Sequence, residues 1–267
     1  MHCETQSRQT DRVVSPPALP FYAWEQSCGG ALMQLPERLR GSYMPHIITK
    51  IDRADAADVA AISKFGTATI HEAQGRLGAI SSRIKPIDHS MSLCGPAFTV
   101  ESSPRDNIML QLAIHYAQAG DVIVVSAGEF AEAGSFGGVL GNACVAKGIA
   151  GVVTDTGVRD TAELRALGLP VFSLGVSIRG TVKETLGRIN REIVVGGEII
   201  RPGDVICGDA DGLVMVRRKD AANVAQKSAE RDEAELGYIE AYKSGRTIID
   251  VCQLEDVLKA KGLTTDI

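Results

Sequence analysis

The stretch GVVTDTGVRDTAELRALG (151–168) decides the fold. It opens with a short apolar run, passes through a glycine-containing loop and ends in a segment with helical spacing over residues 161–167. A short buried strand followed at once by a helix is typical of an α/β chain. The stretch therefore predicts a strand over 151–155, and a loop that presents Arg159 and Asp160 at the start of the helix.

The same alternation continues on both sides of this stretch. Upstream, helical spacing over 107–119 gives way at a Gly-Asp turn to the apolar run 122–126. Downstream, strands gather towards the end of the chain and one long charged helix covers 220–243. Further helices are predicted from Ala56, from Thr67 and over 140–147, and further strands over 94–101, 171–174, 193–195, 205–206 and 213–216. The pattern predicts a mixed α/β fold around a β-rich core.

The length of 267 residues suits one domain, or one domain with an appendage. Residues 1–45 contain five prolines and no sustained period of two or 3.6, so they are predicted to be a flexible N-terminal extension, or the product of a start codon read too early. Residues 46–267 are predicted to be the folded domain.

Composition excludes several classes of protein. The net charge of −5 provides no basic surface of the kind that nucleic-acid binding needs. The six cysteines form no CxxC pair, and the five histidines form no HxH or HxxxH spacing, so a zinc site is not indicated. No apolar run reaches the roughly 20 residues that span a membrane, and the N-terminus lacks a secretory signal pattern. A reduced, cytoplasmic location is the expectation.

Arg159 and Asp160 are the first candidates for chemistry. A guanidinium can hold a substrate carboxylate with two hydrogen bonds, and a carboxylate can ligate Mg²⁺. The alternative is structural, because Asp is a favoured helix cap and Arg159 could make a surface salt bridge. Residue types alone leave both interpretations open.

A glycine cluster over 134–138 precedes the helix predicted at 140–147. Bare backbone amides at a helix start could cradle a carboxylate or an enolate oxygen. The cluster could equally be a plain turn, and it is not the GxGxxG fingerprint of nucleotide binding.

Several blocks of the chain, in order over Ile51 to Arg218, resemble the class II pyruvate aldolases that cleave 4-hydroxy-4-methyl-2-oxoglutarate and 4-carboxy-4-hydroxy-2-oxoadipate. These enzymes belong to the regulator-of-ribonuclease-activity-A-like family. The matching blocks are GTATIHEAQGRLG (66–78), CGPAFTV (94–100), AGDVIVV (119–125), AKGIAGVVTDTGVRD (146–160), GTVKETLG (180–187) and RPGDVICGDADGLVMVRR (201–218).

The resemblance implies a β-rich, swivelling, phosphohistidine-domain-like α/β core with flanking helices and a long C-terminal helix. It further implies homotrimers or homohexamers, a bound Mg²⁺ or Mn²⁺, and a 2-oxo acid as the small-molecule substrate. By position, Asp160 becomes the metal ligand and Arg159 the residue that steadies the pyruvyl group. The amides of Val139 and Leu140 would hold the pyruvyl carboxylate, and Glu235 of an adjacent subunit would contribute through water.

One position departs from the resembled pattern. The aldolases have an acidic residue twenty-one positions before the arginine, and this chain has Gly138 there. Glu129 or Glu132 could supply the missing carboxylate if their loop folds back.

The implied function is metal-dependent retro-aldol cleavage of a 4-hydroxy-2-oxo acid to pyruvate, in the catabolism of aromatic compounds, with oxaloacetate decarboxylation as a side activity. Two rivals stay open. One is a non-catalytic regulatory binding protein of the ribonuclease-regulator type, which Gly138 favours and the spacing Arg159-Asp160-x-x-Glu163 disfavours. The other is a lyase that acts on a different 2-oxo acid.

Overall fold

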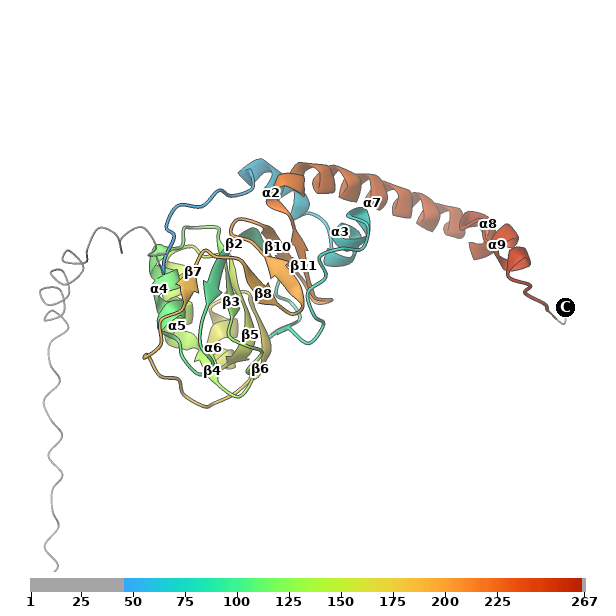
Figure 1. The fold of residues 1–267 in the computed structure, drawn as a ribbon. Coiled ribbons are helices and arrows are strands. Elements are labelled where there is room, and N and C mark those ends of the chain that lie inside the picture. The colour runs from blue at the N-terminus through green and yellow to red at the C-terminus, as the bar shows by residue number, and fades with distance from the viewer. Residues whose placement is uncertain (1–45, 266–267) are drawn as a thin grey trace, which may run out of the picture. The chain divides into compact units, whose positions relative to one another are not determined.

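A computed structural model describes residues 46–265, and a mixed parallel and antiparallel sheet forms their centre (Figure 1). The expected extension over 1–45 lies outside the described residues. The strands are β1 Lys85–Pro86, β2 Leu93–Glu101, β3 Val122–Ser126, β4 Gly134–Phe136, β5 Gly151–Val158, β6 Val171–Val176, β7 Arg188–Ile189, β8 Ile193–Val195, β9 Glu198–Ile200, β10 Val205–Gly208 and β11 Leu213–Val216.

The sheet has the order β1-β6-β5-β3-β2-β10-β11, with β4 paired to β5 and β7 paired to β2. Its centre is parallel, from β2 through β3 and β5 to β6, whereas β10 and β11 join by antiparallel pairing. Parallel strands need crossover connections, and the helices between them supply these. A separate hairpin is formed by β8 and β9.

The helices are α2 Ala56–Ile62, α3 Thr67–Ala73, α4 Ile108–Tyr116, α5 Gly138–Ala146, α6 Thr161–Ala166, the 3₁₀ turn η2 Arg218–Asp220, α7 Ala221–Lys243, α8 Ile248–Val251 and α9 Glu255–Ala260. Most predicted elements lie where the pattern placed them. The helix expected over 140–147 starts two residues earlier, at Gly138, so the last glycine of the cluster begins it and Gly137 is its N-cap.

Strand β5 runs further than the sequence pattern predicted. We expected the strand to end at Asp155 and a loop to follow, but β5 continues to Val158 and is buried throughout. Its second half pairs with β4 on one side and with β6 on the other. Gly157 permits this, because a Cβ there would collide with the backbone carbonyls of Ala131 and Ala133. The glycine that suggested a loop therefore marks a close approach of backbone inside the sheet.

Both faces of the central strands are buried. Ile123 and Val125 of β3 pack with α4, α5 and α6 in one core, while Val122 and Val124 pack on the other face with β8, β9 and β10. A strand buried on both faces reads as a continuous apolar run. This explains why the run VIVVS lacks alternation.

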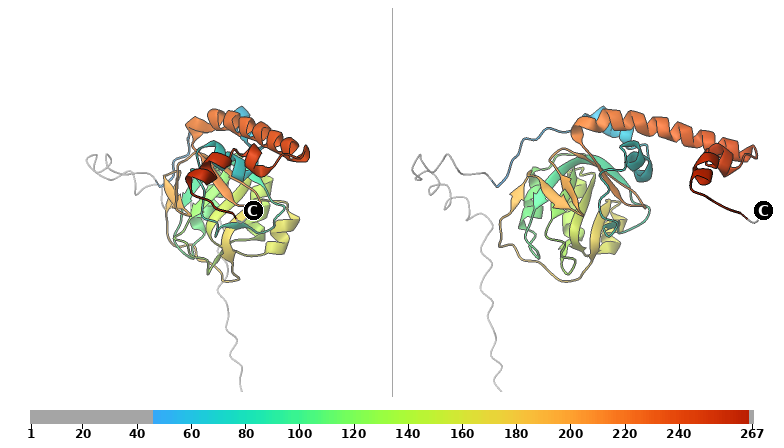
Figure 2. Two further views of the ribbon diagram at one scale, coloured as in Figure 1. Left: turned by 90° about the vertical axis from the view of Figure 1, so that its right-hand side faces the viewer. Right: turned by 45° about the vertical axis from the view of Figure 1, so that its right-hand side comes forward.

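The base of α7 packs with α2 and α3 over β10 and β11, through Val224 and Ala225 among others. Beyond this base the helix extends away from the sheet, and α8 and α9 follow at its far end (Figures 1 and 2). The prediction of one long helix over 220–243 is confirmed. No helix in residues 46–265 is both long and apolar enough to span a bilayer.

Candidate functional site

The end of β5 places Arg159 and Asp160 beside the start of α5. The Arg159 amide donates a hydrogen bond to the carbonyl of Phe136 at 2.9 Å, which joins the end of β5 to the end of β4. Asp160 then adopts a left-handed backbone conformation with φ of 53°. Residues other than glycine rarely take this conformation, and it concentrates at functional sites.

The Asp160 side chain does not cap α6, although Asp160 occupies the N-cap position. Its Oδ2 instead accepts a hydrogen bond from the Gly138 amide at 3.1 Å. The structural alternative for this residue, an ordinary helix cap, is therefore wrong. The left-handed turn aims the carboxylate at the start of α5, where helix N-termini favour negative charge.

Arg159 lies against the same glycines. A Cβ on Gly134 or Gly137 would approach the Arg159 side chain to 2.9 Å, which is too close for carbon atoms. Because Gly134 and Gly137 have no side chains, there is room for the Arg159 side chain to lie against them. Its Nε lies 3.5 Å from Asp160 Oδ2, and 46% of the side chain remains exposed, so the guanidinium can still bind an anion.

Glu163 is a site residue to which the sequence interpretation gave no catalytic or binding role. A Cβ added to Gly138 would overlap the Glu163 carboxyl group, which supplies all three of its nearest atoms. Asn142 steadies this carboxylate by donating from Nδ2 to Oε1 at 3.1 Å. The signal was present in the sequence, since Asp160 and Glu163 are three residues apart and such residues share a helix face.

Glu129 and Glu132 do not supply the carboxylate missing at position 138. Glu129 pairs with Arg83 at 2.9 Å, and Glu132 lies 3.6 Å from a nitrogen of Arg179. The fold-back of their loop towards position 138 is not observed. The structure gives that space to Glu163 instead.

The first amides of α5 are the remaining part of the site. The amide of Gly138 bonds Asp160, and that of Gly141 bonds the carbonyl of Gly137 within the helix. Helix geometry leaves the amides between them, on Val139 and Leu140, without partners inside the helix. Val139 is 81% exposed. These two amides can therefore donate hydrogen bonds to an anion that enters from solvent.

Glu235 lies apart from this group within one chain. Its carboxylate pairs with Arg231 at 3.0 Å on α7, and it lines a pocket of about 400 Å³ together with Glu72 of α3. No hydrogen bond or ion pair joins it to Asp160 in the described part of the chain. A role for Glu235 at the Asp160 site requires a second copy.

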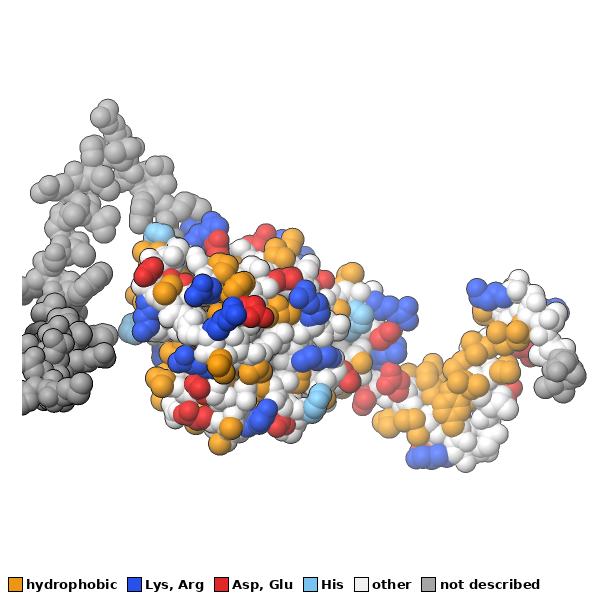
Figure 3. All heavy atoms as spheres, turned by 90° about the horizontal axis from the view of Figure 1, so that it is seen from below, with side chains coloured by type: hydrophobic (Ala, Val, Ile, Leu, Met, Phe, Trp, Pro, Cys, Tyr) orange, Lys and Arg blue, Asp and Glu red, His pale blue; other side chains and the backbone are white. Residues whose placement is uncertain are grey.

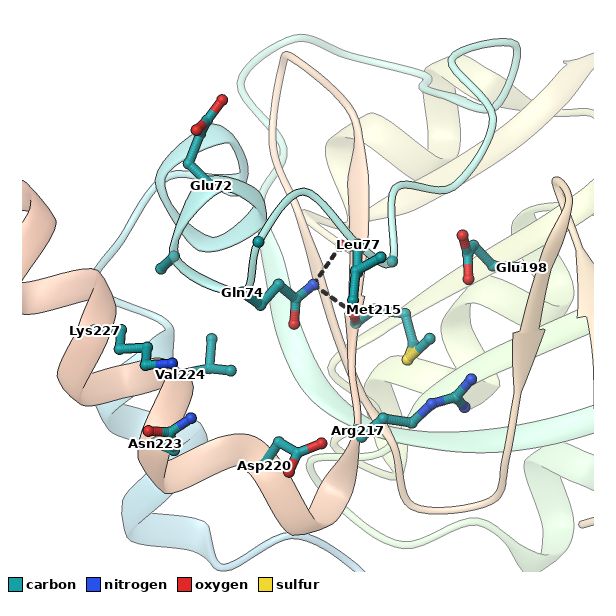
Figure 4. A pocket seen from close by; sticks show the side chains of 13 residues that line it. Glu72, Gln74, Leu77, Glu198, Met215, Arg217, Asp220, Asn223, Val224 and Lys227 are labelled. Atoms are coloured by element: carbon teal, nitrogen blue, oxygen red, sulfur yellow. Dashed lines mark hydrogen bonds between the residues drawn. The ribbon is translucent and has the colours of Figure 1, made fainter.

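A pocket of about 620 Å³ lies between α3, β11 and α7, beside the hollow that Glu235 lines. Figure 4 shows Gln74 reaching from α3 to the carbonyls of Leu77 and Met215, at 2.6 and 3.0 Å. Arg217, Lys227, Glu72 and Glu198 are among the charged side chains that line the pocket. None of the site residues predicted from the sequence lines it.

The residues at the start of α5 fit a hard divalent cation in chemical type. Carboxylate oxygens are the ligands that Mg²⁺ prefers, and Mg²⁺ commonly keeps several waters while only one or two carboxylates bind it. Asp160 and Glu163 both bring carboxylates to the Gly137–Gly138 turn. No group of three or more His, Cys, Asp or Glu side chains suited to a metal occurs within residues 46–265. One chain therefore offers a partial ligand set of two carboxylates.

Asp155 organises the loop that faces the site from β5. Its carboxylate accepts hydrogen bonds from the amides of Ala127 at 2.6 Å and Glu129 at 3.1 Å. Burial raises the pKa of Asp155, and these amides offset part of that rise. The side chain is 2% exposed, so it acts as a buried tie between β5 and the loop that follows β3.

The structure defines a mixed α/β protein in which the turn between β5 and α6 places the Asp160 carboxylate at the start of α5. A family model described as "RraA-like: Aldolase/RraA" matches residues 56–215. The chain belongs to the RraA-like family. The family resemblance predicted from the sequence blocks is confirmed, as is the β-rich α/β core with flanking helices and a long C-terminal helix.

Relatives and solved structures agree on this assignment. A Halalkalibacterium halodurans protein named "Putative 4-hydroxy-4-methyl-2-oxoglutarate aldolase" is 38% identical over 185 residues, which cover 67% of this chain and 88% of the relative. A Burkholderia multivorans protein with the same name is 32% identical, over 54% of this chain and 87% of the relative.

Among solved structures, an uncharacterized protein from Pseudomonas syringae pv. tomato is similar with a TM-score of 0.69 and 25% identity, over 76% of this chain and 96% of that chain. Streptomyces coelicolor RraAS2, described as an unusual member of the RNase ES inhibitor RraA protein family, has a TM-score of 0.63 and 26% identity. It covers 70% of this chain and 99% of its own.

Proposed function

We propose that the protein is a metal-dependent lyase that cleaves a 4-hydroxy-2-oxo di- or tricarboxylic acid to pyruvate and a second oxo acid. The observation that carries the proposal is the left-handed turn at Asp160, which sends a carboxylate to the start of α5 where Glu163 brings a second one. Relatives named as 4-hydroxy-4-methyl-2-oxoglutarate aldolases support the substrate class.

Asp160 is the residue that would hold Mg²⁺ or Mn²⁺, and Glu163 lies beside it at the Gly137–Gly138 turn. Bound there, the ion supplies Lewis-acid polarisation of the substrate 2-oxo group. The amides of Val139 and Leu140 bind the neighbouring carboxylate, and the exposed Arg159 guanidinium stabilises negative charge on the oxygen of the departing pyruvate enolate.

Cleavage also needs a base for the 4-hydroxyl proton, and Glu163 is suited to accept it. As this proton leaves, C4 becomes a carbonyl carbon and the C3–C4 bond breaks. The bonding electrons pass to the pyruvyl fragment as its enolate, which then takes a proton at C3 to give pyruvate. Oxaloacetate decarboxylation passes through the same enolate and is the proposed side activity.

The proposed enzyme is an oligomer, a homotrimer or homohexamer, in which Glu235 of one copy faces the Asp160 site of another. The apolar side chains of α7 beyond its packed base support this. Leu236 is 57% exposed and Ile239 46%, and α8 adds Ile248 at 61%. Figure 3 shows hydrophobic side chains gathered on this C-terminal segment. An exposed apolar patch of this kind marks an interaction surface.

The test is pyruvate release from 4-hydroxy-4-methyl-2-oxoglutarate, 4-carboxy-4-hydroxy-2-oxoadipate and oxaloacetate with added Mg²⁺, followed through reduction of pyruvate by lactate dehydrogenase. We expect activity in the wild type and a loss of at least about 100-fold in Asp160→Ala, since a group that organises the reacting charge contributes that much. Wild type that releases no pyruvate from any of the three contradicts the lyase assignment.

A second candidate is a non-catalytic regulator of a ribonuclease, supported by the Streptomyces structure described as a member of an RNase ES inhibitor family and by Gly138. Calorimetric titration with Mg²⁺ and Mn²⁺ separates the two. A lyase binds the ion and loses that binding in Asp160→Ala, whereas a regulator shows no heat in either protein.

A further inference from the structure

Two cysteines lie directly opposite each other on neighbouring antiparallel strands, far from the site described above. Cys94 of β2 and Cys207 of β10 are register partners, and their Sγ atoms are 3.2 Å apart. Residues directly opposite in an antiparallel pair project from the same face of the sheet. The two thiols therefore face each other across the strand pair. The cysteines are scattered along the sequence, and that spacing alone would have suggested that each is buried separately.

The spacing of these strands suits a covalent link. Directly opposed residues have Cα atoms about 4.5–5.5 Å apart, inside the range of about 4.4–6.8 Å that disulfides span. From 3.2 Å the sulfur atoms need to approach by about 1.2 Å to reach bonding distance. Rotation of the two side chains can supply that movement without a shift of the backbone.

The two thiols differ in a way that suits stepwise oxidation. A hydrogen bond with Cys207 lowers the pKa of Cys94 despite burial, and the same contact together with burial raises the pKa of Cys207. Cys94 is also the more accessible one, because it is half-buried and lines two pockets of about 370 Å³ each. A small oxidant can therefore reach Cys94, which acts as the nucleophile, and Cys207 lies beside it as the second thiol.

We propose that Cys94 and Cys207 are a peroxide-reactive dithiol that closes to an intramolecular disulfide. The Cys94 thiolate attacks one oxygen of hydrogen peroxide, becomes a sulfenic acid and releases water after proton transfer. The Cys207 sulfur then attacks the Cys94 sulfur and expels the sulfenic oxygen as a second water. Two thiols lose two electrons and two protons, and one peroxide becomes two waters.

The disulfide would lock strands that carry α2, α3 and the base of α7. Cys207 belongs to the core shared by these helices, and Cys94 Sγ contacts the carbonyl of Val59 on α2 at 3.6 Å. The link joins residues 113 positions apart, and crosslinks over long loops remove much freedom from the unfolded chain. We therefore expect oxidation to stabilise the protein.

Two other described cysteines lack such a partner, and Cys144 serves as the internal control. Cys144 is buried alone, and burial raises its pKa to about 12, so it should resist peroxide. Cys252 is exposed, and its sulfur lies 3.4 Å from the Tyr242 hydroxyl. It can form mixed or intermolecular species but has no opposed thiol in the described residues.

The experiment treats the full chain, with Cys3, Cys28 and Cys252 replaced by Ser, with a small excess of hydrogen peroxide. Peptide mapping without reductant should find the Cys94 and Cys207 peptides joined with the loss of two hydrogen atoms. The thermal midpoint should rise by about 5 °C and return to its starting value on reduction.

Single variants test the assigned order. Cys207→Ser should leave a sulfenic acid on Cys94 that dimedone traps, and should show no thermal shift on oxidation. Cys94→Ser should leave Cys207 unlabelled. The proposal is overturned if both thiols survive the peroxide in the parent protein, or if Cys144 is oxidised as fast as Cys94.

Discussion

At the scale of single residues, Gly138 and Glu163 act as one feature. The space that a side chain at position 138 would need is filled by the Glu163 carboxyl group. Gly138 has no positive φ, so its backbone conformation accepts a side chain once that space is vacated. A carboxylate can therefore reach the same place from either position.

This equivalence makes a prediction about activity. Glu163→Ala should lower kcat/KM for pyruvate release by about 100-fold, the usual contribution of a positioned acid–base group. Adding Gly138→Asp to Glu163→Ala should restore part of the loss, because the new carboxylate enters the vacated space. Gly138→Asp alone should restore nothing and should lower activity, since its side chain meets Glu163. Steady-state kinetics of the three variants tests this.

The sequence predicted the residues of the site better than their conformations. Arg159, Asp160 and the amides of α5 were expected to act together, and they lie together. The left-handed turn at Asp160 was not predictable, because Asp takes that conformation only where the surrounding structure imposes it. The sequence shows that Asp160 and Glu163 share a helix face, but the closeness of Glu163 to Gly138 depends on the approach of α6 to α5, and no local pattern records that approach.

At the scale of elements, Asp106 ties the segment between β6 and β7 to the start of α4. Its carboxylate accepts hydrogen bonds from the amides of Ile108 at 2.9 Å and of Glu184 and Thr185 at 2.8 Å each. Burial favours a higher pKa for Asp106, but the three amides outweigh it and the pKa is lowered. These bonds fix the C-terminal part of the segment between β6 and β7. At the start of that segment the Ser177 amide bonds the carbonyl of Val158, the residue before Arg159.

The lowered pKa of Asp106 determines how its contribution to protein stability changes with pH. A carboxylate with a depressed pKa in the folded state stabilises the protein above its unfolded pKa of about 3.9, and the contribution is lost as pH falls through the folded value. We expect Asp106→Asn to lower the free energy of unfolding by about 1–3 kcal/mol near neutral pH, because three amides lose a charged acceptor.

Urea unfolding of wild type and Asp106→Asn across acidic pH measures this difference, with Asp232→Asn on the exposed face of α7 as the control. The gap between wild type and Asp106→Asn should close as pH falls below about 3.9. A gap that is constant with pH, or equal to that of the control, contradicts the assigned role.

Element boundaries followed the sequence pattern except where tertiary pairing overrode it. Strand β5 extends past the expected loop because β4 and β6 pair with its second half. The pairing of β4, a strand of only three residues, could not be anticipated, since three residues carry no measurable period. The long α7 was predictable because its charged pattern extends over many turns.

At the scale of the whole molecule, the apolar part of α7 predicts assembly. Replacing Leu236 and Ile239 together by Lys should convert an oligomer to monomers, because buried apolar contacts would become buried charges. The matched control replaces Asp232 and Glu233 by Lys on the same helix. Light scattering after size-exclusion chromatography reads the mass, and a double variant that keeps the wild-type mass contradicts an interface at this surface.

The most direct test of the lyase account is kcat/KM for pyruvate release from 4-hydroxy-4-methyl-2-oxoglutarate with Mg²⁺, measured for wild type, Glu163→Ala and Gly138→Asp/Glu163→Ala. The account predicts an active wild type, a loss of about 100-fold in Glu163→Ala and partial recovery in the double variant. Equal rates for wild type and Glu163→Ala, or a wild type without activity, would contradict the claim that carboxylates meeting at the start of α5 form a lyase site.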